Sequence, residues 1–384
     1  MGLIHIVTPE YPPTLGGVAD YARHIAEALA AAGEDVHIWC PAGGQRPTGG
    51  GLHVHGTFEG FNRSDFARTD RELDGFPAPR RLFVQWVPHG YGRHSMNLSF
   101  CLWLRRRARQ GDTVELMVHE PFLTFWEGTW RQTLVAAVHR VMTTVLLQAA
   151  SRVWISIPAW ERMWKPFALG RRVPFSWLPI TSGLARPAEQ DVCALRASLT
   201  AGRRPLVGHL GTYGRNVTSM LDVLVPEILR SSPDADVMLL GAGSNEYRST
   251  LVQRDRALEG RLLAAGRLDE PALALHVAAC DVLVQPYPDG ISSRRTTAMA
   301  ALRIGVPLVA TRGYLTEPFW SETRVVRMHD VRRLADMAND VRDLLCDGDA
   351  RARLAVAGRD LYARMFDVNL VVNALTQSKA GKAA

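Results

Sequence analysis

The chain has 384 residues, of which 47% are hydrophobic and 22% are charged, and its formal net charge is +7. This composition excludes a disordered or low-complexity protein, and the length predicts two domains, because single hydrophobic cores stop growing near roughly 250 to 300 residues. The positive charge favours anionic lipid surfaces, nucleic acids or phosphate-bearing small molecules as partners. High-GC codon usage gives the same arginine-rich composition, so the charge alone selects no partner.

The cysteines and the longest apolar stretch predict a cytoplasmic protein. The five cysteines are widely scattered, include no C-x-x-C pair and are not preceded by a secretory leader. Residues 133–150 are apolar, but His139 and Arg140 interrupt them before they reach the length of a membrane span. We expect a core-packed helix there.

The first half of the chain alternates strand-like and helix-like segments. Residues 18–33 have helical spacing, and residues 61–76 are polar and are expected to be irregular. Apolar runs of strand length lie at 3–8, 35–40, 81–87, 114–119 and 152–156. This alternation predicts a parallel sheet that is covered by helices on both faces.

The same alternation begins again after residues 176–190, a stretch rich in Pro, Ser and Gly that marks a domain boundary. The later strand-like runs are 205–214, 235–244, 262–268, 281–288 and 306–311, with helical material at 217–229 and 331–364. We therefore predict two doubly wound, Rossmann-like α/β domains that face each other across a cleft. The first covers 1–185, the second covers 186–365, and the segment 366–384 is expected to pack back on the first.

Gly16 and Gly17 stand between a proline-marked loop and the helix predicted from Val18. Because they are adjacent, they do not form the G-x-G-x-x-G turn that binds dinucleotides. They do allow the main chain to approach a ligand, while N–H groups at the helix start point at an anion. A simple loop-to-helix cap is the alternative.

Two stretches of the second half predict a phosphate-binding site. In GHLGTYGR, residues 208–215, His209 and Arg215 lie around a glycine-rich strand end, where a guanidinium can hold a diphosphate at two points. In DGISSRR, residues 289–295, Ser292 or Ser293 is suited to cap a helix that runs to about Ile304. The arginines that follow would oppose the helix dipole, which favours a bound anion over a solvated charged face.

Polar side chains follow two strands of the first half. His119 and Glu120 come after one strand, and His89 and Tyr91 come after another. Strand ends of such sheets face the ligand crevice, so these side chains are expected to contact a polyhydroxy ligand, with a structural role as the alternative. No metal site is predicted, because the histidines and carboxylates show no H-x-x-x-H or paired-ligand spacing.

With these motifs the chain resembles the retaining, nucleotide-sugar-dependent glycosyltransferases of family 4, which have the GT-B fold. YPPTLGGV resembles the Gly-Gly loop that approaches the donor phosphates, and VHEPF lies where the family places a histidine beside the donor sugar. GHLGTYGR falls where the family holds the diphosphate with an Arg and a Lys. DGISSRRTTAMAALRIGVPLVAT is similar to the element in which seven residues separate two glutamates.

The resemblance implies a set of site residues. The catalytic residues would be His119, Arg215 and Asp289, and the acceptor contacts His89, Tyr91 and Glu120. The donor contacts would be Gly16, Gly17, His209, Gly211, Tyr213, Arg215, Arg267, Asp289, Gly290, Ile291, Ser292, Ser293, Arg294 and Thr297. The chain departs from the family at four of these positions, with His209 at the usual Arg, Arg215 at the usual Lys, and Asp289 and Thr297 at the two glutamates.

The resemblance also implies the reaction. A sugar passes from a nucleotide-diphosphate sugar to a hydroxyl of a saccharide, a lipid-linked or a small-molecule acceptor, with retention of configuration and without a metal or other cofactor. The departing phosphate takes the acceptor proton, and no nucleic acid takes part. Two other functions stay open, a GT-B epimerase of sugar nucleotides and a non-catalytic partner subunit that binds them.

The location of the protein has one further alternative. Trp126, Trp130 and nearby arginines fit a peripheral contact with the inner face of an anionic membrane, because such interfaces favour aromatic and basic side chains. An acceptor pocket or helix packing explains the same tryptophans.

Overall fold

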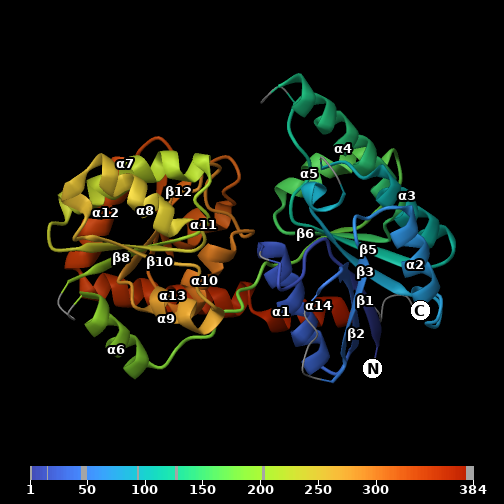
Figure 1. Ribbon diagram of the computed structural model, residues 1–384, viewed down its shortest axis with the longest axis horizontal. Coiled ribbons are helices and arrows are strands. Elements are labelled where there is room, and N and C mark those ends of the chain that lie inside the picture. Colours follow the sequence, from blue (N-terminus) through green and yellow to red (C-terminus); the bar gives the residue numbers. More distant parts are fainter. Residues whose placement is uncertain are drawn as a thin grey trace. The chain divides into compact units, whose positions relative to one another are not determined.

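The structure is a computed structural model of the chain (Figure 1). It describes residues 2–14, 16–44, 50–92, 95–125, 129–200 and 204–377, so Trp126 lies outside the described residues. The chain divides into two compact units, one made of the residues up to Pro179 with those from Val368 onward, the other of Ile180–Asp367. From the sequence, the two boundaries between these units are predicted at 185/186 and 365/366.

The first unit is built on a seven-stranded parallel sheet in the order β3-β2-β1-β4-β5-β6-β7. The strands are β1 (Leu3–Val7), β2 (Asp35–Pro41), β3 (Leu52–Phe58), β4 (Arg81–Trp86), β5 (Thr113–Val118), β6 (Arg152–Ile155) and β7 (Phe175–Trp177). Because β1 lies between β2 and β4, the direction of the connections reverses there, and polar residues that follow β1, β4 and β5 share one edge of the sheet.

Helices cover both faces of this sheet. They are α1 (Gly17–Ala31), α2 (Arg63–Leu73), α3 (Leu98–Arg109), α4 (Trp130–Ala149), α5 (Ala159–Trp164) and α14 (Val368–Gln377). The C-terminal helix α14 packs against α1, and α3 packs against α4 (Figure 1). Within the described part of the chain, we find no helix with the length and hydropathy of a membrane span.

The second unit contains a six-stranded parallel sheet in the order β10-β9-β8-β11-β12-β13. The strands are β8 (Leu206–Leu210), β9 (Asp236–Leu240), β10 (Leu262–Gly266), β11 (Val282–Gln285), β12 (Leu308–Arg312) and β13 (Val326–Asp330). The helices are α6 (Glu189–Thr200), α7 (Arg215–Ser231), α8 (Ser244–Arg254), α9 (Glu270–Ala278), α10 (Thr296–Ile304), α11 (Pro318–Thr323), α12 (Leu334–Cys346) and α13 (Gly348–Met365). In Figure 1, α7, α8 and α12 lie on one side of the sheet and α9, α10 and α13 on the other.

The predicted fold of two parallel-sheet, Rossmann-like α/β units is confirmed, and two local expectations are wrong. Residues 61–76 are not irregular, because they contain α2. The Asn62 side chain accepts hydrogen bonds from the N–H groups of Ser64 and Asp65, while the Asp65 carboxylate accepts from the N–H of Asn62. This reciprocal capping box starts a helix whose few apolar side chains, such as Phe66, face the core.

The second error concerns α10, which begins at Thr296 rather than at the serines. The residue before it, Arg295, has an extended backbone and provides no side-chain cap. Ser293 instead donates from both its N–H and its hydroxyl to the buried carboxylate of Glu317. The serines are therefore held by a partner 24 residues away and not by the helix that follows them.

Candidate functional site

The centre of the second sheet is the point where the strand order reverses. The strand β8 lies between β9 and β11, and chain connections leave it in both directions. Ligands of open parallel sheets bind outside the carboxyl ends of the strands at such a reversal. Two side chains join the strands there, since His209 Nδ1 donates to the carbonyl of Val284 at 3.0 Å and Gln285 Nε2 donates to the carbonyl of Leu210 at 2.9 Å.

His209 offers an uncharged acceptor at this reversal. Its side chain is 2% exposed, and burial lowers its pKa to about 4, so the ring is neutral near pH 7. Because Nδ1 carries the proton that is donated to Val284, Nε2 has a lone pair. That atom has no hydrogen-bond partner among the described residues, and it faces the turn at Gly211, where an added Cβ would lie 3.4 Å from it. His209 therefore cannot hold a diphosphate by charge, but it can accept from a hydroxyl.

Arg215 and Arg267 are the exposed cations near this edge. Arg215 is the first residue of α7 and forms no ion pair with any described residue. A cation in the first turn of a helix is disfavoured by the helix dipole, so its position is stabilised only when an anion binds beside it. Arg267 follows β10 at the same edge of the sheet and also has no ionic partner within the described ranges.

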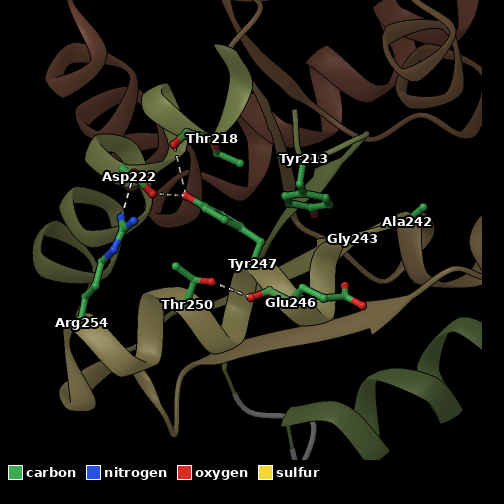
Figure 2. Close-up of a pocket in the computed structure, with 9 residues that line it drawn as sticks. All are labelled: Tyr213, Thr218, Asp222, Ala242, Gly243, Glu246, Tyr247, Thr250 and Arg254. Atoms are coloured by element: carbon green, nitrogen blue, oxygen red, sulfur yellow. Dashed lines mark hydrogen bonds and ion pairs between the residues drawn. The ribbon is translucent and has the colours of Figure 1, made fainter. Parts of the chain in front are cut away.

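An open pocket of about 420 Å³ lies between α7 and α8, close to the end of β8 (Figure 2). Tyr213 forms one wall, where its hydroxyl donates to the carbonyl of Leu240 at 3.2 Å and its ring meets His209 edge-on at 5.6 Å. The ring of Tyr247 lies 5.3 Å from that of Tyr213. The lining residues are Tyr213, Thr218, Asp222, Ala242, Gly243, Glu246, Tyr247, Thr250 and Arg254. Tyr213 and Gly211, two of the predicted donor contacts, thus lie beside His209.

The loop after β11 holds the second predicted cluster, but its charges pair with one another. Asp289 accepts hydrogen bonds from the guanidinium groups of both Arg294 and Arg295. The guanidinium of Arg295 also lies 4.7 Å from the ring centre of Tyr287, whose hydroxyl is 2.7 Å from Thr297 Oγ1. The carboxylate of Asp289, which the sequence predicts as a donor contact, is therefore shared by two guanidinium groups and offsets part of their charge.

The remaining residues of this loop are buried or act through the main chain. Gly290 has φ +87°, and a Cβ there would lie 2.2 Å from the N atom of Gly313. This contact requires glycine and holds the loops after β11 and β12 together. The Ile291 side chain is fully buried. Ser292 is also fully buried, and its hydroxyl has no partner in the part of the chain that the structure describes.

Glu317 was missed by the sequence analysis. It lies at the start of α11, is 8% exposed, and accepts from Ser293 and from Trp320 Nε1 at 3.0 Å. Burial raises the pKa of this carboxyl, although the hydrogen bonds from Ser293 and Trp320 oppose the rise. No local motif marks it, because its main partner lies on the loop after a different strand.

In the first unit, His119 follows β5, as predicted, and its ring is half-buried. Nε2 donates to the side-chain oxygen of Gln85 at 2.8 Å, and the ring meets that of Tyr21 edge-on at 5.0 Å. Burial lowers the pKa of His119 to about 4, which the charge of Glu120 only partly opposes. The imidazole is therefore neutral near pH 7, and Nδ1 is an acceptor.

His89 and Glu120 form a pair that joins the ends of β4 and β5. His89 Nδ1 lies 3.4 Å from a carboxylate oxygen of Glu120, and both side chains are about half exposed. The hydrogen bond to Glu120 raises the pKa of His89 above its ordinary value, although burial opposes the rise. The two residues can offer a donor and an acceptor together to a hydroxyl-bearing ligand.

Tyr91, by contrast, is a core residue. Its side chain is fully buried, its hydroxyl donates to the carbonyl of Gln85 at 2.7 Å, and its ring stacks on Phe100 at 4.2 Å. The prediction of an acceptor contact is corrected for this residue, because no part of the side chain is available to a ligand.

The glycines before α1 lie at its first turn. Gly17 begins the helix, and Gly16 precedes it with φ 167°, an extended conformation that any residue adopts. A Cβ on Gly16 would lie 2.1 Å from the carboxylate of Glu10, a side chain that can move away. The backbone conformation at this position therefore does not require glycine. The neighbouring Leu15 lies outside the described residues.

The chain is similar to known proteins in three respects: a family model, sequence and fold. Residues 204–359 match the family model described as glycosyl transferases group 1. The phosphatidyl-myo-inositol mannosyltransferase of Mycolicibacterium smegmatis (strain ATCC 700084 / mc(2)155) is 24% identical over 319 residues, which are 80% of this chain and 75% of the relative.

Solved structures share the fold over nearly the whole chain. Sucrose-phosphate synthase from Thermosynechococcus elongatus has a TM-score of 0.75 at 16% identity and covers 99% of this chain and 98% of its own. HepE from Anabaena, solved in complex with UDP and glucose, has a TM-score of 0.69 at 15% identity, with 98% of this chain and 100% of its own covered.

The two Rossmann-like units thus have the GT-B fold that these solved structures share. The reversal point of the second sheet lies within the segment that matches the family model. That segment is similar to the group 1 glycosyl transferases, and the chain is similar in sequence to a mannosyltransferase.

Proposed function

We propose that the protein transfers a glycosyl group from a nucleotide-diphosphate sugar to an acceptor hydroxyl, with retention of configuration and without a metal ion in the reaction. One observation carries the proposal. At the reversal of the second sheet, the unpartnered Nε2 of a buried, neutral His209 lies close in sequence to Arg215, an unpaired cation at a helix start. The strand β8 and the turn after it therefore carry both a hydrogen-bond acceptor for a sugar hydroxyl and a cation for a diphosphate.

The order of the strands supports one orientation of the donor along the carboxyl ends of the second sheet. Neighbouring strands lie roughly 4.8 Å apart, so the end of β10, which Arg267 follows, is about 10 Å from the end of β8. The sugar then lies at the junction of β8 and β11, and the nucleoside extends towards β9 and β10. The diphosphate lies between them, at the first turn of α7 and at Arg215. The complex of HepE with UDP and glucose supports a donor of this class.

The chemistry requires that negative charge on the leaving diphosphate be stabilised. The bond between the anomeric carbon and the phosphate oxygen breaks, and a bond to the acceptor oxygen forms on the same face of the sugar. The acceptor proton moves to the departing phosphate, so no side-chain base is needed. Arg215 and the free N–H groups at the start of α7 stabilise the growing charge, which is the role that a metal ion plays in other enzymes.

We assign the acceptor contacts to the first unit. The paired His89 and Glu120 and the neutral His119 follow neighbouring strands, and each presents a polar atom that can bind a hydroxyl. The first turn of α1 at Gly16 and Gly17 remains a second phosphate contact in this proposal. Peripheral contact with a membrane also remains a proposal, and Trp130, which is 72% exposed, is the described residue that fits it.

The test compares Arg215→Ala with a charge-matched control, Arg256→Ala. Arg256 is exposed and follows α8, at the opposite edge of the same sheet. A panel of nucleotide-diphosphate sugars is incubated with candidate acceptors, and transfer is measured at saturating donor. We expect kcat to fall by roughly 10²- to 10³-fold in Arg215→Ala, because the contact strengthens in the transition state, and to stay unchanged in Arg256→Ala.

Equal turnover in the two variants would remove Arg215 from the mechanism. The configuration of the product, determined by NMR, tests retention separately. Release of nucleotide without any acceptor would favour the epimerase, and binding of nucleotide without turnover of any donor would favour the non-catalytic partner subunit.

A further inference from the structure

Four histidines of the first unit lie side by side on three neighbouring strands. His5 of β1 is in register with His37 of β2, and His37 is in register with His53 of β3. Two residues further along, Trp39 of β2 is in register with His55 of β3. Residues in register, or two apart on one strand, point to the same face of a sheet, so the rings gather on one side of β1, β2 and β3.

Three side chains at the start of β2 and β3 converge on one point. A single carboxylate oxygen of Asp35 lies 3.3 Å from His37 Nε2 and 3.4 Å from His53 Nε2. One nitrogen or oxygen atom from each of the three residues lies within 4.8 Å of the others. For metal-ligand bonds of about 2.0–2.1 Å, the ligand atoms of a tetrahedral site are about 3.3–3.4 Å apart. The observed distances to Asp35 match that spacing.

The contacts behind His37 are those of a second coordination shell. His37 Nδ1 lies 2.8 Å from His55 Nε2, and His55 Nδ1 lies 3.3 Å from a carboxylate oxygen of Glu72. The ring of Trp39 stacks on His55 at 4.1 Å and fixes its plane. A metal-bound histidine usually donates its other N–H to a group that ends in a carboxylate, and this chain of contacts has that form.

We propose that Asp35, His37 and His53 bind one divalent transition-metal ion of the zinc class. The ligands are two imidazole nitrogens and one carboxylate oxygen, a set that such ions prefer. The side chains of His53 and Asp35 are 53% and 43% exposed, so an ion can enter from solvent and keep a water ligand. No residue of the proposed transfer reaction belongs to the site, and the inference does not depend on that reaction.

The sequence predicted no metal site, because its histidines and carboxylates show no H-x-x-x-H or paired-ligand spacing. The ligands are spread over D-V-H at 35–37 and H-V-H at 53–55, two short patterns that meet only when β2 and β3 pair in register. Each pattern alone is common in strands.

The test uses the full chain without a polyhistidine tag, after treatment with a chelator. Zn²⁺ is titrated calorimetrically, and Co²⁺ is added to a second sample to record its visible absorption, which reports tetrahedral coordination. We expect one ion per chain. His53→Ala and Asp35→Asn should each weaken binding at least about 10-fold and abolish the Co²⁺ band, because each removes one of three ligands.

The matched control is His329→Ala. His329 Nε2 lies 2.6 Å from a carboxylate of Asp340 in the second unit, so this variant removes a histidine from a pair that has no third ligand among the described residues. It should bind Zn²⁺ as the unaltered chain does. Both ligand variants change partly exposed side chains near the edge strand β3, and circular dichroism of the metal-free proteins checks that they fold.

Two results would overturn the proposal. One is the absence of saturable binding near one ion per chain. The other is equal affinity in His53→Ala, Asp35→Asn and His329→Ala, which would mean that the ion binds elsewhere on the chain. If one ligand variant fails to fold, the other gives the same comparison.

Discussion

Asp289 holds two guanidinium groups at once, and this explains why a basic pair is tolerated just before α10. The carboxylate accepts from Arg294 and Arg295, and all three side chains are less than one quarter exposed. Without the carboxylate, two like charges would face each other in a partly buried loop. The residue is therefore placed to hold the loop together.

At the scale of this residue we predict that Asp289→Asn destabilises the second unit. Hydrogen bonds to charged groups contribute about 1.5–3 kcal/mol each, and partial exposure reduces this, so the expected loss is about 2 kcal/mol. For a unit of this size that corresponds to a fall in Tm of roughly 4–8 °C. The order of preference among donor sugars should be unchanged, and calorimetry together with donor competition measures both.

Glu227→Gln is the control for Asp289→Asn. It breaks a surface pair with Arg230, whose side chain is 73% exposed, in the same unit and should change Tm little. An altered donor preference in Asp289→Asn without any change in Tm would show that the carboxylate contacts the sugar.

At the scale of elements, α2 depends on a single buried carboxylate. Asp65 is 1% exposed and accepts N–H hydrogen bonds from Glu59, Gly60 and Asn62. Burial alone would raise the pKa of Asp65, but these N–H groups and the charge of Arg68 outweigh it and hold the pKa below its ordinary value. The carboxylate therefore stabilises the loop and the helix start when it is ionised.

We predict that Asp65→Asn lowers the thermal stability of the first unit at pH 7 by about 1–3 kcal/mol, because an amide accepts these N–H groups less strongly. A lowered folded-state pKa means that the stabilisation is present above the ordinary pKa of a carboxyl and is lost as the pH falls through the folded value. The difference between the variant and the unaltered chain should therefore shrink in acid. Melting curves at pH 7 and in the acid range check this.

The control for Asp65→Asn is Glu59→Gln. The Glu59 side chain is 68% exposed, and its pair with Arg68 lies in solvent, so its loss should change little. A constant difference between Asp65→Asn and the unaltered chain over the whole pH range would contradict the role assigned to the charge.

The elements also show what the sequence could predict. Strands with continuous apolar runs, such as β9 and β11, were found from their residues alone, because both faces of a parallel sheet are buried. The strand β3 was not found, since its histidines interrupt the apolar pattern, and α2 was missed because its mean hydropathy is low and its start depends on side-chain hydrogen bonds.

The candidate site was likewise predictable only where its residues lie within one short stretch of sequence. Arg215 at a helix start and His209 beside a glycine turn could be read from one short stretch. The pairing of Ser293 with Glu317 could not, because the two residues meet only when β11 and β12 bring their loops together. The neutral state of His209 also follows from burial, which no local pattern reveals.

At the scale of the molecule, the first unit is completed by the end of the chain. The helix α14 returns from the second unit and buries Val371, Val372 and Leu375, packing against α1. Arg81 Nη1 also donates to the carbonyl of Leu375 at 2.7 Å, which ties α14 to the start of β4. The first unit is therefore made of two segments far apart in sequence, and a chain that ends after α13 would expose the surface that α14 covers.

We predict that a chain ending at Asp367 has a destabilised first unit and an intact second unit. Burial of an aliphatic side chain contributes about 1.5–3 kcal/mol, so three of them represent roughly 4.5–9 kcal/mol. Hydrogen exchange should show lost protection in α1 and β2, while α7 and β8 stay protected. A chain ending at Gln377 keeps α14 and should match the full chain. Lost protection in α7 and β8 instead, or none in either unit, would contradict this assignment, because α14 packs against α1 and belongs to the first unit.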